Sequence, residues 1–300
     1  MADRGTLQAQ APPRKHSEDL LTVLLRWTKG AGATMLLYTV LTVIALFMML
    51  PFIWMLSTSF KPQNEIFTQP PILISSNMSL DGYQFITGRG VWQSLWNTFY
   101  ISAAFTLGGV FFCTLGGFGF AKYRFPGRKG LFLLLLATMM IPGAVTLVPS
   151  YFIMREFGWI NTVYPLIVPG AANAFGIFFM RQYISTLSDE LLDAARIDGC
   201  SEFAVFWRVV FPVVAPGAIS LGLIFFMSSW NNYLGPLIYL KSPDKFTLPL
   251  FMMTMTGPPG FSAYREYMGI AVISVVPLLA LFLVMQRRFI EGITAGSLSG

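Results

Sequence analysis

The stretch DELLDAARIDGCSEFAVFWRVVFP, residues 189–212, is a polar segment in a chain that is otherwise strongly apolar. It holds five of the chain's 14 acidic residues. It also lies between two runs, residues 163–184 and 213–239, that are each long and apolar enough to cross a membrane. A polar segment in that position is either a simple loop between membrane spans or a surface that binds another protein.

The pattern of caps and glycine predicts that this segment folds as two short helices joined by a tight turn. Ser188 can cap the first helix, whose opening acidic residues favour the positive end of the helix dipole. Gly199 can end that helix, because glycine adopts the left-handed conformation without strain. Ser201 can cap a second helix over residues 202–211, which Pro212 closes. We call residues 188–212 the elbow.

Small side chains precede the predicted turn. Ala194 and Ala195 leave little more than backbone on the surface there, and small residues let another protein approach closely. The simpler interpretation is an interfacial loop in which Phe203, Phe206 and Trp207 lie against lipid.

Composition places most of the chain in lipid, because 55% of its residues are hydrophobic, 11% are charged and its mean hydropathy is +0.62. A spanning helix needs about 20 apolar residues. One further apolar run, residues 246–264, is interrupted by Pro249, Pro258 and Pro259, so only a short helix over 248–255 is expected there. The sequence predicts an all-α integral membrane protein with six transmembrane helices and the elbow between the fourth and fifth. Their approximate ranges are 34–56, 97–119, 131–153, 163–184, 213–239 and 266–286.

Lysine and arginine are distributed unequally between the two sides of this predicted bundle. Of the 20, 13 lie in the N-terminal tail (1–33), the C-terminal tail (287–300) and the loops after the second and fourth spans, and Arg181 lies at the end of the fourth span on the same side. The other six lie in the remaining loops. The positive-inside rule therefore predicts that both tails and the elbow are cytoplasmic, with the transmembrane domain over residues 34–290.

Several classes of function lack the residues that they need. The single histidine, His16, lies in the N-terminal tail, and Cys113 and Cys200 form no metal-binding or disulfide spacing, so no metal site and no catalytic residues are predicted. No Gly-Lys pair occurs, so the chain has no P-loop for ATP. Basic residues flank the apolar runs instead of gathering on one surface, which argues against nucleic acid as a partner.

Uncharged polar residues in two spans are candidates for a solute pathway. Asn173 lies in the fourth span, and Trp230, Asn231, Asn232 and Tyr233 lie towards one end of the fifth. Amides pair with sugar hydroxyls, and aromatic rings stack on the C–H faces of sugars. In the alternative interpretation the asparagines link helices to one another, and the aromatic residues anchor the membrane interface.

The elbow resembles the EAA motif of the membrane permeases of ATP-binding-cassette importers. That motif reads EAA, three residues, Gly, nine residues, an aliphatic residue, one residue, then Leu-Pro. Here Asp193-Ala194-Ala195 precedes Gly199 at the same spacing, and Val209 and Phe211-Pro212 follow. Asp193 replaces the usual Glu and shortens its reach, which puts in doubt an ion pair from this position to a partner.

Matches outside the elbow extend the resemblance over nearly the whole chain after the N-terminal tail. In order they look like the smaller, six-helix permease of carbohydrate importers similar to the maltose system. They are Ser59-Phe60-Lys61-Pro62, Asn97-Thr98, Tyr123-Arg124-Phe125-Pro126-Gly127, Trp230-Asn231-Asn232-Tyr233 and Gln286-Arg287-Arg288-Phe289 with Gly292.

The resemblance implies a subunit of a larger assembly in a bacterial inner membrane. The expected partners are a second permease subunit in a heterodimer, two ATP-binding subunits, an extracytoplasmic solute-binding protein, membrane lipid and a sugar substrate. The elbow would couple transport to ATP hydrolysis through Asp193, Ala194, Ala195, Asp198 and Gly199. The chain itself would be no enzyme and would bind no cofactor, since ATP and magnesium would act on the partner ATPase subunits.

Two alternatives stay open at this point. The same kind of importer could carry glycerol phosphate or an acidic oligosaccharide. In a different class, the chain would be a membrane scaffold that docks a cytoplasmic partner without moving a solute.

Overall fold

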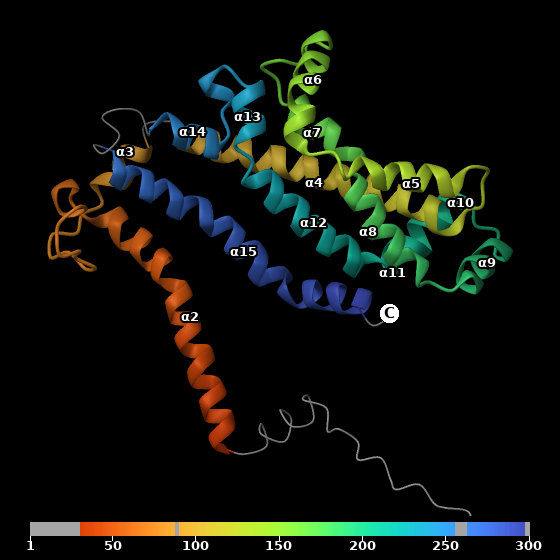
Figure 1. Ribbon diagram of the computed structural model, residues 1–300, viewed down its shortest axis with the longest axis horizontal. Coiled ribbons are helices and arrows are strands. Elements are labelled where there is room, and N and C mark those ends of the chain that lie inside the picture. Colours follow the sequence, from red (N-terminus) through yellow and green to blue (C-terminus); the bar gives the residue numbers. More distant parts are fainter. Residues whose placement is uncertain (1–30, 88–89, 256–262, 298–300) are drawn as a thin grey trace, which may run out of the picture. The chain divides into compact units, whose positions relative to one another are not determined.

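A computed structural model describes residues 31–87, 90–255 and 263–297, and every regular element within these ranges is a helix (Figure 1). The all-α prediction is confirmed. The chain divides into two compact units, residues 1–54 and 55–300, which are described separately.

The first unit contains most of helix α2 (Ala31–Phe60). Residues 1–30 of the predicted N-terminal tail lie outside the described residues. Along α2 the apolar side chains are exposed, for example Met35 at 74% and Phe47 at 73%. A helix that is apolar all round needs lipid or another protein to cover it.

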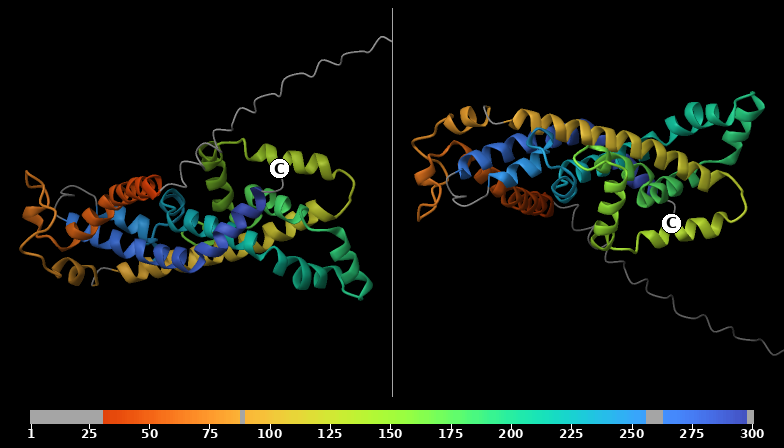
Figure 2. Two further views of the ribbon diagram at one scale, coloured as in Figure 1. Left: turned by 90° about the horizontal axis from the view of Figure 1, so that it is seen from below. Right: turned by 90° about the horizontal axis from the view of Figure 1, so that it is seen from above.

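Three helices form the centre of the second unit: α4 (Val91–Lys122), α8 (Ala174–Ser185) and α12 (Ala215–Trp230). Both α8 and α12 pack on α4, and α15 (Tyr264–Ser297) packs on α12 (Figures 1 and 2). A Cβ atom on Gly117 would lie 2.7 Å from the backbone nitrogen of Arg181. Only glycine therefore allows α4 and α8 to approach this closely.

Shorter elements complete the unit. They are η1 (Gln63–Glu65), α3 (Asp81–Thr87), α5 (Arg128–Thr138), α6 (Gly143–Glu156), α7 (Tyr164–Ile167), η2 (Val168–Ala172), α9 (Asp189–Ile197), α10 (Glu202–Ala204), η3 (Val205–Val210), α11 (Phe211–Val213), α13 (Leu234–Tyr239), η4 (Pro243–Lys245) and α14 (Leu248–Thr254). The short helix expected over 248–255 is thus present as α14.

Three of the expected spans are interrupted. Residues 131–153 form α5 and α6, which meet at an angle of 99° where Pro142 offers no N–H to continue the helix. Residues 163–184 form α7, η2 and α8, with Pro169 and Gly170 in the irregular part. Residues 213–239 form α12 and α13, because the ring of Pro236 would clash with the carbonyl of Asn232 in a continuous helix.

The number of membrane crossings depends on two bent pairs of helices, α5 with α6 at 99° and residues 202–213 with α12 at 79°. Among the described residues, three helices are long and apolar enough to span, or up to five if each bent pair is one span. Six crossings therefore stay a prediction. At the C-terminal end, α15 runs to Ser297, so most of the expected tail continues this helix.

The largest buried cluster joins the elbow to the three central helices. Phe118 of α4, Met180 of α8 and Leu221 of α12 belong to it, together with Leu192 of α9 and Phe206 of η3. The elbow is therefore part of the same hydrophobic core as the bundle.

Candidate coupling elbow and solute pathway

The elbow consists of two helical arms that meet at Gly199, as expected. The first arm is α9, and Gly199 follows it with φ +82° in the left-handed region. Hydrogen bonds from Gly199 N to Arg196 O and from Cys200 N to Ala195 O, both 3.0 Å, close the turn. The geometry of a glycine C-cap is thus present.

One of the two predicted N-caps is present, and the second arm ends later than expected. Ser201 does cap it, because Ala204 N donates to Ser201 Oγ at 3.4 Å, but the Ser188 side chain makes no capping hydrogen bond. The arm continues through the π-helical turn η3 to Val213. Pro212 therefore does not close it, and the arm ends one residue later at Val213.

The two alanines of the elbow point in different directions. Ala194 is exposed, as are Asp193, Asp198 and Gly199. Ala195 is only 8% exposed and packs in the core, so it cannot form part of a docking surface. Ile197, which sequence reasoning missed, is 86% exposed beside the turn.

Charged side chains tie the elbow together and fasten it to α4. Arg196 pairs with Asp193 and Glu202, both at 2.9 Å. Lys122, in the last turn of α4, pairs with Asp189 at 2.7 Å, and the hydroxyl of Tyr123 donates to Glu202. Asp193 is therefore paired within this chain.

These pairings shift the pKa of both carboxyl groups that face α4. The hydrogen bond from Lys122, followed by its charge, lowers the pKa of Asp189 below its usual range. The hydrogen bonds from Arg196 and then Tyr123 lower the pKa of Glu202. Both groups are anions at neutral pH, which keeps the contacts to α4 intact.

Asn173 lies at the break between η2 and α8. Its side-chain oxygen accepts a hydrogen bond from Gly176 N at 3.0 Å and so caps α8. Its backbone carbonyl accepts a hydrogen bond from Ile177 N at 3.0 Å and also faces the thiol of Cys113 on α4, with an S to O distance of 3.4 Å. Interrupted helices in membrane proteins are tolerated where they are buried in protein or line a cavity, and they often mark solute sites in transporters.

Residues 230–233 form the second break, between α12 and α13. Asn232 accepts a hydrogen bond from Gly235 N at 3.1 Å and so opens α13, while Asn231 is exposed and donates to Met227 O at 2.9 Å. Tyr233 is half-buried. Trp230 is 1% exposed and stacks on Phe226 at a centroid distance of 5.4 Å, so its ring is not open to a solute.

The two breaks lie at different points of the sequence, but Ile167 of α7 and Tyr233 pack against the same buried cluster, which includes Leu166. Each break contains an asparagine that caps the helix after it. The expected amides are therefore present at breaks in two spans, with their side-chain oxygens engaged in capping.

Residues 113–294 match the family described as "Binding-protein-dependent transport system inner membrane component". The match covers the elbow and both breaks. The chain belongs to this family. It is thus the membrane-embedded permease component of an importer that works with a binding protein.

Individual relatives agree with this assignment along most of the permease. The arabinooligosaccharides transport system permease protein AraQ of Halalkalibacterium halodurans is 34% identical over 261 residues, which are 86% of this chain and 93% of AraQ. The sn-glycerol-3-phosphate transport system permease protein UgpE of Escherichia coli is 29% identical over 240 residues, 77% of this chain and 85% of UgpE.

A solved structure shares the fold of the permease. It is the crystal structure of a bacterial ABC transporter involved in the import of the acidic polysaccharide alginate. The match has a TM-score of 0.77 at 22% identity and covers 85% of this chain and 96% of that chain.

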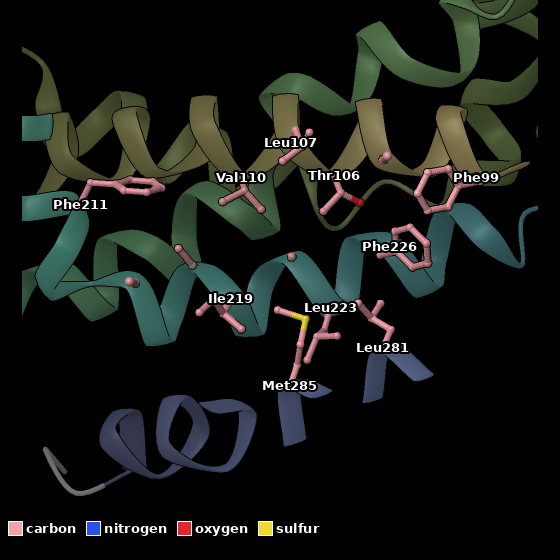
Figure 3. A pocket seen from close by; sticks show the side chains of 14 residues that line it. Phe99, Thr106, Leu107, Val110, Phe211, Ile219, Leu223, Phe226, Leu281 and Met285 are labelled. Atoms are coloured by element: carbon pink, nitrogen blue, oxygen red, sulfur yellow. The ribbon is translucent and has the colours of Figure 1, made fainter. Parts of the chain in front are cut away.

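A groove of about 470 Å³ lies between α4, α12 and α15 in the permease (Figure 3). Phe99, Leu107, Ile219 and Met285 are among its lining residues, and Thr106 is the polar member of the lining. Sugar hydroxyls need paired donors and acceptors, which this lining does not offer. The lining is therefore a poor chemical match to a carbohydrate.

Proposed function

We propose that this permease forms half of the membrane pathway for a sugar or oligosaccharide and that its elbow docks on an ATP-binding subunit. The observation that carries the proposal is the glycine turn at Gly199, which presents exposed Ala194, Ile197 and Asp198 on a short two-helix arm. A short exposed arm of this kind can bind in a cleft of another protein. The arm also shares its hydrophobic core with the bundle, so its movement would be passed to the bundle.

The energy for transport comes from outside this chain in this proposal. The sequence has no Gly-Lys pair and therefore no P-loop, so ATP and magnesium bind to the partner subunits. Closure of two ATP-binding subunits around ATP would pull the elbow, and the packed helices would turn as a body to open the pathway on the other side of the membrane. The chain supplies movement and no catalysis.

The assembly has further partners and a defined orientation in this proposal. A second permease subunit completes the pathway as a heterodimer, and an extracytoplasmic binding protein delivers the solute. The excess of lysine and arginine near the elbow and in the two tails favours a cytoplasmic location for all three.

The residues at the two breaks favour a neutral polyhydroxyl solute. Asn173, Asn231 and Asn232 carry amides without charge, and the fifth span from 213 to 239 contains no charged residue. A phosphorylated or acidic solute would favour cationic groups at those places. The relatives include a permease named for glycerol 3-phosphate and a structure involved in alginate import, so such solutes are the alternative to test.

The test is ATP hydrolysis and uptake by the complete importer in proteoliposomes. The binding protein is loaded in turn with mono-, di- and oligosaccharides, glycerol 3-phosphate and uronate oligomers. Faster ATP hydrolysis and solute uptake with neutral sugars would support the proposal. Response only to glycerol 3-phosphate or uronates would give the alternative solute class, and elbow-dependent ATPase binding without any uptake would indicate a scaffold.

A further inference from the structure

Helix α4 touches both the elbow and the segment that leads into α14. It is a continuous helix of 32 residues, so it is about 48 Å long at about 1.5 Å per residue. That length exceeds the hydrocarbon thickness of a membrane, about 30 Å. Both ends of α4 carry side chains that bond to segments far away in the sequence.

At the elbow end, two consecutive residues hold both arms. Lys122 pairs with Asp189, the first residue of α9, and its ammonium also donates to the carbonyl of Leu187. The Lys122 side chain is 7% exposed, so this pair is shielded from water on one side. Tyr123 donates to Glu202, the first residue of α10, whose other contact is Arg196. The dipeptide therefore binds the start of each arm.

Apolar packing reinforces these polar contacts. The ring of Phe118 lies 5.2 Å from that of Tyr123 and 5.7 Å from that of Phe206 in the second arm, measured between centroids. All three belong to, or pack against, the largest buried cluster. Well-packed interiors transmit displacement because they have little room to deform. A movement of the elbow must therefore carry the end of α4 with it.

At the far end, two buried residues of α4 hold the segment 244–248. The amide of Asn97 donates to the carbonyls of Asp244 and Phe246 at 2.8 and 3.0 Å. The hydroxyl of Thr98 accepts a hydrogen bond from Leu248 N at 2.7 Å. Asn97 is 3% and Thr98 1% exposed, so these bonds are protected from water. Leu248 is the first residue of α14, so both residues fix where this helix begins.

We propose that α4 is a rod that transmits displacement between the elbow and the segment 244–248. Lys122 and Tyr123 form the joint at the elbow, and Asn97 and Thr98 form the joint at the far end. These four are positioning residues that touch neither ATP nor solute. The proposal rests on the proposed function, in which an ATP-binding subunit moves the elbow, and it adds the path by which that movement reaches the opposite face of the membrane.

Two conservative variants test the two joints. Tyr123→Phe removes the hydroxyl and keeps the ring on Phe118, and Thr98→Val removes the acceptor for Leu248 N and keeps the shape. Tyr164→Phe and Thr146→Val are matched controls, because both residues are exposed and lie outside the joints. The measurements are assembly of the complete importer, its ATP hydrolysis with and without binding protein, and solute moved per ATP in proteoliposomes.

We expect both joint variants to assemble and hydrolyse ATP at the parent basal rate, while solute moved per ATP falls about fivefold, the effect of losing one hydrogen bond. If α4 acts as a single rod, breaking either joint interrupts the same path. The double variant should therefore also move about fivefold less solute per ATP than the parent. A product of the two effects, about 25-fold, would mean independent roles and would overturn the proposal. An unchanged ratio of transport to ATP hydrolysis in both single variants would overturn it as well.

Two further measurements keep the test decisive. If either variant does not assemble, Glu202→Gln and Gln93→Ala weaken the same joints from their exposed sides, since Gln93 donates to Asn97 Oδ1 at 3.0 Å. The proposed function is checked separately by Gly199→Val. Normal binding of the ATP-binding subunit by that variant would count against the elbow as docking site, whereas uncoupling by Tyr123→Phe and Thr98→Val concerns the rod.

Discussion

Substitution of Gly199 separates the geometry of the elbow turn from its surface. With φ +82°, the residue lies in the left-handed region, and a Cβ atom there would meet nothing within 4 Å. The cost of a side chain is therefore backbone strain alone. It is about 1–2 kcal/mol for an ordinary L-residue, less for asparagine and more for a β-branched residue. A cost of 1–2 kcal/mol lowers the population of the native turn by a factor of about 5–30.

Asparagine and valine make the comparison sharp, because they differ in left-handed preference more than in size. Gly199→Val should reduce both uptake and co-purification of the ATP-binding subunit, while Gly199→Asn keeps most of both. Membrane insertion should be normal in each variant. Gly158→Val is the matched control, since Gly158 also has a left-handed φ of +68° and open space around it but lies outside the elbow.

Two results would refute this reasoning. Equal losses in Gly199→Asn and Gly199→Val would show that the size of the side chain at the docking surface decides, and the turn conformation does not. Parent-like uptake by Gly199→Val would show that the left-handed turn is not needed for coupling at all.

Further predictions concern the packing and the charges of the bundle. Asn173→Ala loses the cap on α8 and should destabilise the protein by about 1 kcal/mol, visible as a lower melting temperature in detergent that Asn173→Ser largely restores; an unchanged melting temperature would exclude the capping role. Gly117→Val pushes α4 away from α8 and should lower the free energy of unfolding by about 1–3 kcal/mol, measured by thermal unfolding. A variant as stable as the parent would contradict the close approach of the two helices. Leu192→Ala opens a cavity under the elbow and should lower the free energy of unfolding by about 2–5 kcal/mol. Protease cleavage near residue 199 should become faster, and resistance equal to that of the parent protein would argue against a packed elbow. Because the pKa of Glu202 is lowered in the folded protein, ionised Glu202 stabilises the elbow at any pH above the ordinary glutamate pKa. This stabilisation is lost as the pH falls through the lowered pKa. Hydrogen-exchange protection of the elbow should then stay constant from about pH 8 to 5 and fall below about pH 4, and a loss already between pH 7 and 6 would point to another group.

The elbow could be predicted from the sequence because its determinants are local. Gly199 and the Ser201 cap lie within a few residues of the backbone groups that they serve. The Ser188 cap and the end at Pro212 were wrong. Ala195 was wrong for a different reason, because whether an alanine faces a partner or the core depends on Leu192 and Phe206, and their packing is set by the bundle.

The interrupted spans were harder to predict for a related reason. Hydropathy averages over about 20 residues, so the runs 131–153, 163–184 and 213–239 all look continuous. Pro142 and Pro236 were visible in the sequence, yet proline is tolerated in membrane helices when neighbours satisfy the freed backbone groups. Pro51 in α2 and Pro277 in α15 show this, because both helices continue through their prolines.

The joints of α4 could not be inferred from the pattern at all. Tyr123 and Glu202 are 79 residues apart, and Asn97 and Asp244 are 147 apart. The resemblance had picked out Asn97-Thr98 and the segment after Lys122 as matches. The roles of these residues follow only from the backbone that the fold brings beside them.

The thiol of Cys113 facing the Asn173 carbonyl has a practical consequence for following the permease at work. The chain has two cysteines, and the second, Cys200, is half-buried next to the elbow turn, while Cys113 is buried. One native thiol on α4 therefore faces the break in the fourth span, and the other lies beside Gly199. Alkylation rates of these two sites, read by mass spectrometry, report on both places during the transport cycle without any engineered label.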